Sequence, residues 1–254
     1  MAETTASLEA VPETRLNPFS TLIGVMFRPH RTFTLMREAE RGYWWVVAVL
    51  AVLSVIVLVA AQIPAYSKLS GGVAVSEAQS SNDSSNQPAQ VQQAGGISNF
   101  LIVSRLVGNL IGLGITYLIR ATILYLLGLS FGGRATFKQI FRMAVWTTLP
   151  DVIRNFVGAA AVLATGNVPS RGLSYIFSST EYVGASKILI AILEGIDVYL
   201  IWSLVLIAVG VAATYQLSRI KSWVVTLIYW IIGLLFTIGG AAIGQVTSSL
   251  GRGG

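Results

Sequence analysis

Two long stretches of the sequence contain no charged residue, and they constrain the fold more than any other feature. They run from Gly42 to Ser67 and from Ser222 to Gly251. A bilayer core about 30 Å thick is crossed by roughly 20 apolar residues in a helix, which satisfies every backbone hydrogen bond internally. Both stretches meet this length. The sequence therefore predicts an all-α integral membrane protein.

Three further segments complete a predicted bundle of five transmembrane helices. The segment from Val198 to Ser218 is also uncharged, whereas the apolar runs at 106–130 and 143–165 hold charges within them. A central charge costs about 2.5 to 3.5 kcal/mol on insertion, which surrounding Leu, Ile and Val residues offset. The predicted spans are about 43–63, 106–130, 143–165, 196–217 and 223–245, within a membrane domain at 42–246.

The composition also favours a membrane location. The chain of 254 residues is 54% hydrophobic and only 11% charged, whereas soluble domains carry about a quarter charged residues. This excludes a disordered chain, a nucleic-acid-binding domain and a soluble enzyme as leading interpretations. Cysteine is absent, so no disulfide, thiolate metal site or cysteine nucleophile can form.

The distribution of Lys and Arg predicts the orientation of the five spans. With the N-terminus in the cytosol, the cytoplasmic segments hold ten cations and the opposite side five, and positive charge gathers on the cytoplasmic side of membrane proteins. We therefore expect a cytosolic N-terminus and a C-terminus outside. The ten are Arg15, Arg28, Arg31, Arg37, Arg41, Arg134, Lys138, Arg142, Arg219 and Lys221; the five are Lys68, Arg105, Arg171, Lys187 and Arg252.

For residues 1–41 the sequence predicts a cytosolic arm with helices at the membrane surface. Asn17 and Pro18 can cap and start a helix, and apolar residues then recur at helical spacing beside cations. Such a pattern next to an anionic leaflet favours an interfacial amphipathic helix, with a docking helix for a cytosolic partner as the alternative. The residues of this arm are Phe19, Leu22, Ile23, Met26, Phe27, Arg28 and Arg31.

Two other segments lie outside the predicted spans. Residues 67–97 are rich in Ser, Gln, Asn and Gly and almost free of large apolar residues. A segment of this composition cannot bury enough surface to fold by itself. We predict a flexible outer loop there, and a short C-terminal tail at 247–254.

Ionisable residues inside the predicted spans are the sharpest functional candidates, because charges in hydrocarbon are costly unless paired or hydrated. Asp151 and Arg154 are three residues apart and can pair along one helix face. We expect two arginines to turn inward and meet two aspartates, with Glu194 closer to water. A lock that fixes helix register is the favoured role, and a proton or solute pathway is the alternative. The residues are Arg120, Asp151, Arg154, Glu194 and Asp197.

Small residues indicate where helices could approach closely. Gly108 and Gly112, and likewise Gly240 and Gly244, are separated by three residues, the spacing that lets helix backbones pack tightly in membranes. Packing within the bundle is favoured, and a face between subunits is the alternative. Pro150 is expected to kink the third span and free a carbonyl that Thr147 or Arg154 could satisfy.

No motif in the sequence predicts an enzyme. There is no HExxH or P-loop pattern, and the single histidine, His30, lies in the arm. A Ser–His pair or a histidine-bearing metal site therefore cannot be assembled within the bilayer. We expect no catalytic residue, no metal and no cofactor.

Longer stretches of the chain resemble the Yip1-domain family. The stretches are NPFSTLIGVMFRPHRTF before the first span, LLGLSFGGRATFKQIFRMAVWTTLPDVI with its Gly-Gly loop and proline, and EGIDVYLIWSLVLIAVGVAATYQLSRIKSWVV with its basic turn. The resemblance covers about Asn17 to Gly244 and implies five spans and a cytosolic N-terminus. In eukaryotes the family is tied to vesicle trafficking and Rab-type GTPases. The DLYGP and GYP signatures of that branch are absent, so the resemblance is to the bacterial branch.

This resemblance, together with the pattern of spans, leads to a prediction of function. We expect a non-enzymatic scaffold or accessory subunit of a larger complex in the bacterial cytoplasmic membrane. Its expected partners are the lipid bilayer and another membrane protein or a second copy, with no nucleic acid. A small transporter or channel using the intramembrane charges is the first alternative. A trafficking adaptor that binds a GTPase is the second.

Overall fold

The computed structural model describes residues 17–39, 42–80, 90–167, 172–173 and 187–250, and every regular element in that part of the chain is helical. The predicted all-helical class is confirmed. The helices are α1 (Pro18–Phe27), α2 (Pro29–Glu38), α3 (Trp44–Ser80), α4 (Gln90–Ser130), α5 (Phe137–Trp146), α6 (Leu149–Thr165), α8 (Lys187–Gly195), α9 (Val198–Tyr215) and α10 (Arg219–Leu250).

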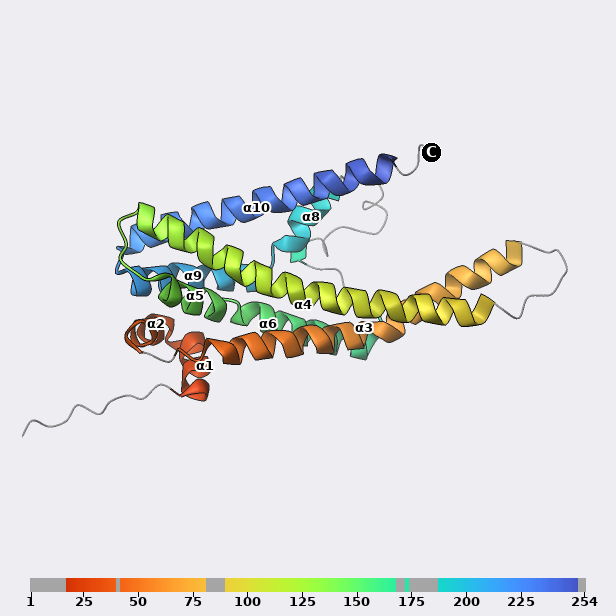
Figure 1. Ribbon diagram of the computed structural model, residues 1–254, viewed down its shortest axis with the longest axis horizontal. Coiled ribbons are helices and arrows are strands. Elements are labelled where there is room, and N and C mark those ends of the chain that lie inside the picture. Colours follow the sequence, from red (N-terminus) through yellow and green to blue (C-terminus); the bar gives the residue numbers. More distant parts are fainter. Residues whose placement is uncertain (1–16, 40–41, 81–89, 168–171, 174–186, 251–254) are drawn as a thin grey trace, which may run out of the picture.

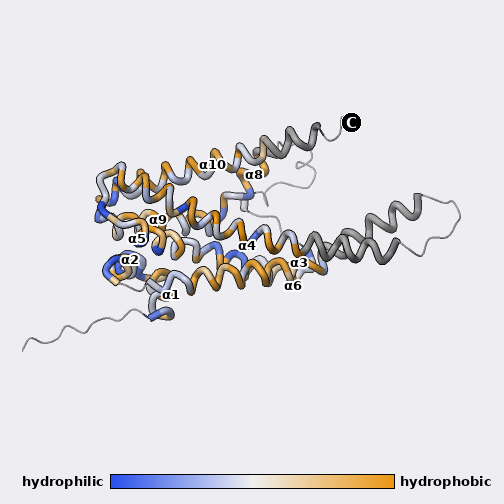
Figure 2. Tube along the Cα trace, in the orientation of Figure 1, coloured by the Kyte–Doolittle hydropathy of each residue, from blue (hydrophilic) through white to orange (hydrophobic). Residues whose placement is uncertain are grey.

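The long helices run side by side along the long axis of the molecule (Figure 1). Four helical segments within the described residues are long and apolar enough to cross a membrane: Trp44–Pro64, Leu106–Ser130, Val198–Tyr215 and Arg219–Ala242. Figure 2 shows hydrophobic residues along these helices and hydrophilic ones gathered around α2 at one end. That end, which also holds the α4–α5 and α9–α10 turns, is called the arm end below.

The third predicted span, at 143–165, is not one continuous helix. It is divided into α5 and α6 by a break at Thr147 and Thr148, and α6 alone has 17 residues. Pro150 lacks the N–H that would bond to the carbonyl of Trp146, which weakens the helix there. The hydroxyls of Thr147 and Thr148 donate to the carbonyls of Ala144 and Val145, each at 2.7 Å.

The predicted loop at 67–97 is shorter than expected. Helix α3 continues to Ser80 and α4 begins at Gln90, so the prediction of a loop is wrong for 67–80 and 90–97. Residues 81–89 lie outside the described part. A helix nucleated in the membrane can add polar residues at little cost, because each one adds a backbone hydrogen bond without a new nucleation step.

The N-terminal arm is built into the bundle rather than only resting beside it. Helix α2 packs against α9 and α5, and Phe33 and Met36 are buried in the core. A side chain at Gly210 of α9 would meet Met143 at 2.8 Å and Phe33 at 3.5 Å. The bare backbone at Gly210 therefore lets α2 and α5 approach α9 closely.

Three donors from α5 fasten the arm to the start of α3. Gln139 Nε2 donates to the Arg37 carbonyl at 3.1 Å, and Arg142 Nη1 donates to the Ala39 carbonyl at 2.9 Å. Trp146 Nε1 donates to the Gly42 carbonyl at 2.9 Å. These backbone carbonyls lie at the end of α2 and in the segment that leads to α3, where no hydrogen bond within a helix is available to them. The three side chains of α5 satisfy them.

A tyrosine at the end of α9 joins it to α4 at the arm end. The hydroxyl of Tyr215 donates to the carbonyl of Tyr125 at 2.9 Å, and its ring packs against Gly128 and Gly133 so closely that any Cβ there would overlap it. Gly132, in the turn that follows α4, has a φ of 83°, which favours glycine. The Gly-Gly loop is thus required by a ring contact and a left-handed turn.

Candidate functional site: an intramembrane ionic network

Two helix breaks place carboxylates at helix N-termini inside the bundle. Asp197 is the N-cap of α9 and its Oδ1 accepts from the Leu200 amide at 2.7 Å. Asp151 lies in the first turn of α6, directly after the break at Thr147 and Thr148. The N-terminal ends of helices carry unpaired N–H groups and a partial positive charge. Each carboxylate therefore lies beside the unpaired N–H groups of a helix end.

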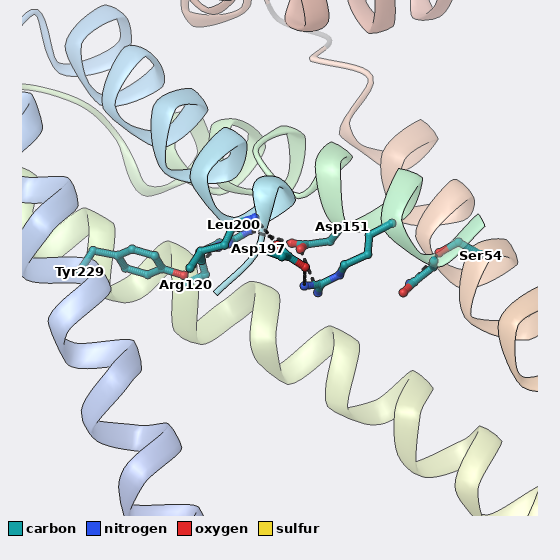
Figure 3. A network of polar contacts seen from close by, with 8 residues as sticks. Ser54, Arg120, Asp151, Asp197, Leu200 and Tyr229 are labelled. Atoms are coloured by element: carbon teal, nitrogen blue, oxygen red, sulfur yellow. Dashed lines mark hydrogen bonds and ion pairs between the residues drawn. The ribbon is translucent and has the colours of Figure 1, made fainter. Parts of the chain in front are cut away.

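Arg154 connects these two carboxylates (Figure 3). Its Nη2 lies 3.2 Å from Asp151 Oδ1, and its Nη1 lies 3.0 Å from Asp197 Oδ2. The first pair has the predicted spacing of three residues along α6. The second joins α6 to α9, which no sequence spacing could indicate.

Arg120 of α4 extends the chain of contacts to α10. Its Nε donates to the Tyr229 hydroxyl at 2.8 Å, and its guanidinium lies 5.7 Å from the centre of that ring. Its Nη1 lies 4.0 Å from Asp151 Oδ2. Arg120, Asp151, Arg154 and Asp197, with Tyr229, form what we call the ionic network.

The charges of the ionic network cancel, since two guanidinium groups face two carboxylates. The side chains of Arg120 and Asp197 are 11% and 13% exposed, and those of Asp151 and Arg154 are each 35% exposed. Removing separate ions from water costs several kcal/mol each, and that cost is offset only when partners and hydrogen bonds are well placed. Pairing across four helices makes these residues tolerable in an apolar bundle.

A polar contact also ties α3 to α6 next to the network. Asn155 Nδ2 donates to Ser54 Oγ at 3.1 Å, and Ser54 Oγ donates to the Ala51 carbonyl at 2.8 Å. The sequence interpretation missed Ser54, Asn155 and Tyr229. A search for every polar side chain in an apolar run, rather than for charges alone, would have identified them as candidates.

Cavities adjoin both ends of the ionic network. One of 390 Å³, the Arg154 cavity, is lined by Arg154, Asp197 and Asn155 together with residues of α3 and Leu173. Another of 210 Å³, the Arg120 cavity, is lined by Arg120, Tyr229 and Ser203 together with apolar residues of α8, α9 and α10. Ile196, in the break between α8 and α9, lines both.

The remaining predicted residues lie apart from this network. Glu194 is exposed near the end of α8. In the arm, Phe19, Ile23 and Phe27 are exposed, with Phe19 and Phe27 at 74% and 76%, while Leu22 and Met26 pack on the core. Arg28 and Arg31 are exposed beside α2. The arm thus has an inner face on the bundle and an outer apolar face.

Three of the predicted glycines have open space beside them in the described part of the chain. No described atom lies within 4 Å of a Cβ built at Gly108, Gly112 or Gly240. Gly244 lies in the last turns of α10, where side-chain surroundings are outside the described residues. Packing within the bundle and a face between subunits both stay predictions for these glycines.

Among the described residues, no group of three or more His, Asp or Glu side chains is placed to hold a metal ion. The carboxylates of Asp151 and Asp197 are already bridged by Arg154. The chemistry of the site is therefore that of ion pairing and hydrogen bonding.

Comparison with known proteins shows where the chain belongs. The Yip1 domain family model matches residues 23–240. The chain is 25% identical over 234 residues to the membrane protein YknW of Bacillus subtilis (strain 168), covering 90% of this chain and 93% of that protein. No solved structure matches it. With most of its length matched by the family model and several apolar helices able to span a bilayer, the chain is a membrane protein of the Yip1 domain family.

Proposed function

We propose that this protein is a non-enzymatic membrane scaffold or accessory subunit that associates with another membrane protein through the outer faces of α4 and α10. The proposal rests on one observation: only a small fraction of the residues in each of these two helices is buried by the rest of the chain. In their most apolar windows only 17% of residues in α4 and 11% in α10 are buried, against 50% in α9. Such faces are available to lipid or to a partner helix.

Glycines on these faces support a protein partner. Gly108 and Gly112 of α4 and Gly240 of α10 have open space where a side chain would be. Without a hydrophobic driving force between helices in lipid, association depends on close van der Waals contact, which small residues permit. A glycine pair that meets no described atom of its own chain is the form such a contact face takes before a partner arrives.

The topology that we propose has five crossings, with α5 and α6 together forming the third. Figure 1 supports this, because α5 and α6 follow one another along the same axis as the four long helices. The cations near the arm end favour a cytosolic position for that end, in the cytoplasmic membrane of a bacterium. Under this proposal the ionic network is a structural lock that fixes α4, α6, α9 and α10 relative to one another.

A transport role is the second candidate, and the two cavities beside the ionic network favour it. Discontinuous helices whose termini meet near the middle of the bilayer are a feature of transporter binding sites. The breaks before α6 and α9 have this arrangement, and they lie next to the Arg120 and Arg154 cavities.

The test replaces both Gly108 and Gly112 with Leu in the full chain, purified from its own membrane in mild detergent. Wild-type protein is expected to co-purify with a stoichiometric membrane partner or second copy, and the double variant to lose at least about tenfold of it, since bulk would separate the helices. Gly114→Leu is the matched control, because Gly114 is equally open but lies on another face of α4. An isolated monomer that supports solute flux in vesicles would contradict the scaffold and favour transport.

A further inference from the structure

The Arg120 cavity contains polar groups that this chain leaves without partners. Arg120 uses Nε on Tyr229, but in the described part of the chain neither Nη1 nor Nη2 makes a hydrogen bond. Ser203, which lines the same cavity, has a buried hydroxyl with no hydrogen-bond partner. A buried donor left unsatisfied costs about 1 to 3 kcal/mol. Donors from α4 and α9 that share one cavity are suited to an acceptor that the chain does not supply.

The guanidinium next to this cavity is also paired less closely than the other guanidinium of the ionic network. Arg154 is held by two carboxylates at 3.2 and 3.0 Å, whereas Arg120 has its nearest carboxylate oxygen, on Asp151, at 4.0 Å. Asp151 is thus engaged more closely by Arg154 than by Arg120. A guanidinium whose two terminal nitrogens make no hydrogen bond within the described residues can bind a carboxylate through both of them.

The walls of the cavity suit an apolar chain attached to that headgroup. Leu200, Leu204 and Trp230 line it, together with Gly195 and Gly233. Both glycines are exposed, and a Cβ at either would meet no atom within 4 Å. The cavity is therefore polar at Arg120 and open toward the outside of α8 and α10. A tail could leave through this opening into the bilayer.

Depth and size restrict the headgroup further. Arg120 lies ten residues before Ser130, the end of α4, which at 1.5 Å per residue is about 15 Å, half of the apolar thickness of a bilayer. The cavity has a volume of 210 Å³. A carboxylic acid is small and can reach this depth uncharged, and it releases its proton to water when Arg120 pairs with the carboxylate. A phospholipid headgroup keeps a charged phosphate and has no uncharged form in which to reach this depth.

From these observations we propose that the Arg120 cavity binds a long-chain carboxylic acid. The carboxylate accepts from the terminal nitrogens of Arg120 and from the Ser203 hydroxyl, and the alkyl tail passes Gly195 and Gly233 into the lipid. Such binding would stabilise the contact between α4, α9 and α10 at the ionic network.

The test measures binding of palmitate to the full chain in nanodiscs by native mass spectrometry, with hexadecanol as the uncharged probe of equal tail length. One palmitate per chain is expected, with hexadecanol at least about tenfold weaker. Gly233→Leu fills the cavity without touching a charge and should abolish palmitate binding. Ser203→Ala removes one hydrogen bond and should weaken it about threefold to tenfold.

Controls separate loss of the site from loss of the fold. Gly114→Leu places the same bulk on an open glycine of α4 outside the cavity, and it should bind palmitate as the wild type does. Equal binding of palmitate and hexadecanol, or unchanged binding by Gly233→Leu, would overturn the proposal. The scaffold role is tested through Gly108 and Gly112, so each proposal can fail without the other.

Discussion

At the scale of single residues, Asp197 shows how one side chain stabilises both a helix and an ion pair. One carboxylate oxygen caps α9 at the Leu200 amide, and the other pairs with Arg154 of α6. The cap alone makes Asp favourable here. The ion pair adds a contact between helices, and neither oxygen is left without a partner.

Replacing Asp197 should separate these two contributions. Asp197→Asn keeps a capping oxygen but removes the charge, and we expect it to destabilise the fold by about 1 to 3 kcal/mol. This is less than for a fully buried pair because Arg154 is 35% exposed. Asp197→Ala also loses the cap and should cost about 1 kcal/mol more. Thermal unfolding in detergent would measure the series.

Glu194→Gln supplies the comparison for that series. Glu194 lies three residues before Asp197, is exposed and makes none of the contacts of the ionic network. Its substitution should leave the unfolding temperature unchanged. If Asp197→Asn were as stable as Glu194→Gln, the pair with Arg154 would have no structural role.

At the scale of elements, α2 shows that the arm is packed into the bundle and does not only rest on a membrane surface. Its inner face is buried against α5 and α9 through Phe33 and Met36, and three donors of α5 hold the segment that follows it. The exposed Phe19 and Phe27 give α1 an outer apolar face, and a role of that face at the membrane surface stays a prediction.

Phe33→Ala should release this arm from the bundle. Phe33 is 1% exposed, and truncation of a buried Phe costs about 3 to 5 kcal/mol of packing. Because the chain has no cysteine, a single Thr32→Cys substitution reports the opening through its reaction with a water-soluble maleimide. Labelling should be slow in the otherwise native chain, since Thr32 is buried, and at least about tenfold faster with Phe33→Ala.

The neighbouring helix provides the matched control for this experiment. Phe27→Ala removes the same side chain from α1, where it is exposed, and it should not change the labelling of the cysteine at position 32. Equal labelling rates in the Phe33→Ala and Phe27→Ala chains would show that α2 is not held by its core contact.

At the scale of the whole molecule, the broken helix pair α5 and α6 decides the topology. The four long apolar helices alone would place both ends of the chain on the same side of the membrane. A fifth crossing by α5 and α6 would place them on opposite sides. Reporters fused to the two termini should therefore report opposite compartments, with the N-terminus in the cytosol.

A shortened chain provides the control for this measurement. Ending the chain after Tyr215 removes α10, so the C-terminal reporter should move into the cytosol with the N-terminal one. Reporters in the same compartment for the full chain would show that α5 and α6 do not cross.

The sequence alone determined those properties that depend on a single segment, such as whether it forms a helix that can cross a membrane. Apolar length selected the helical membrane class, and four of the five predicted spans agree with the structure because each helix satisfies its own backbone. The charges of Arg120, Asp151, Arg154 and Asp197 were also visible as candidates, since a charge in an apolar run is rare. The family resemblance was confirmed over residues 23–240.

Only the tertiary structure decided which residues meet and which faces stay open. Nothing in the spacing of α4 and α10 relates Arg120 to Tyr229, 109 residues away, and a glycine within a span can face a neighbour or open space. Gly210 packs against Met143 and Phe33, whereas Gly108 and Gly112 meet nothing. Helix rotation within a bundle is fixed by contacts between distant segments, and the local sequence does not encode it.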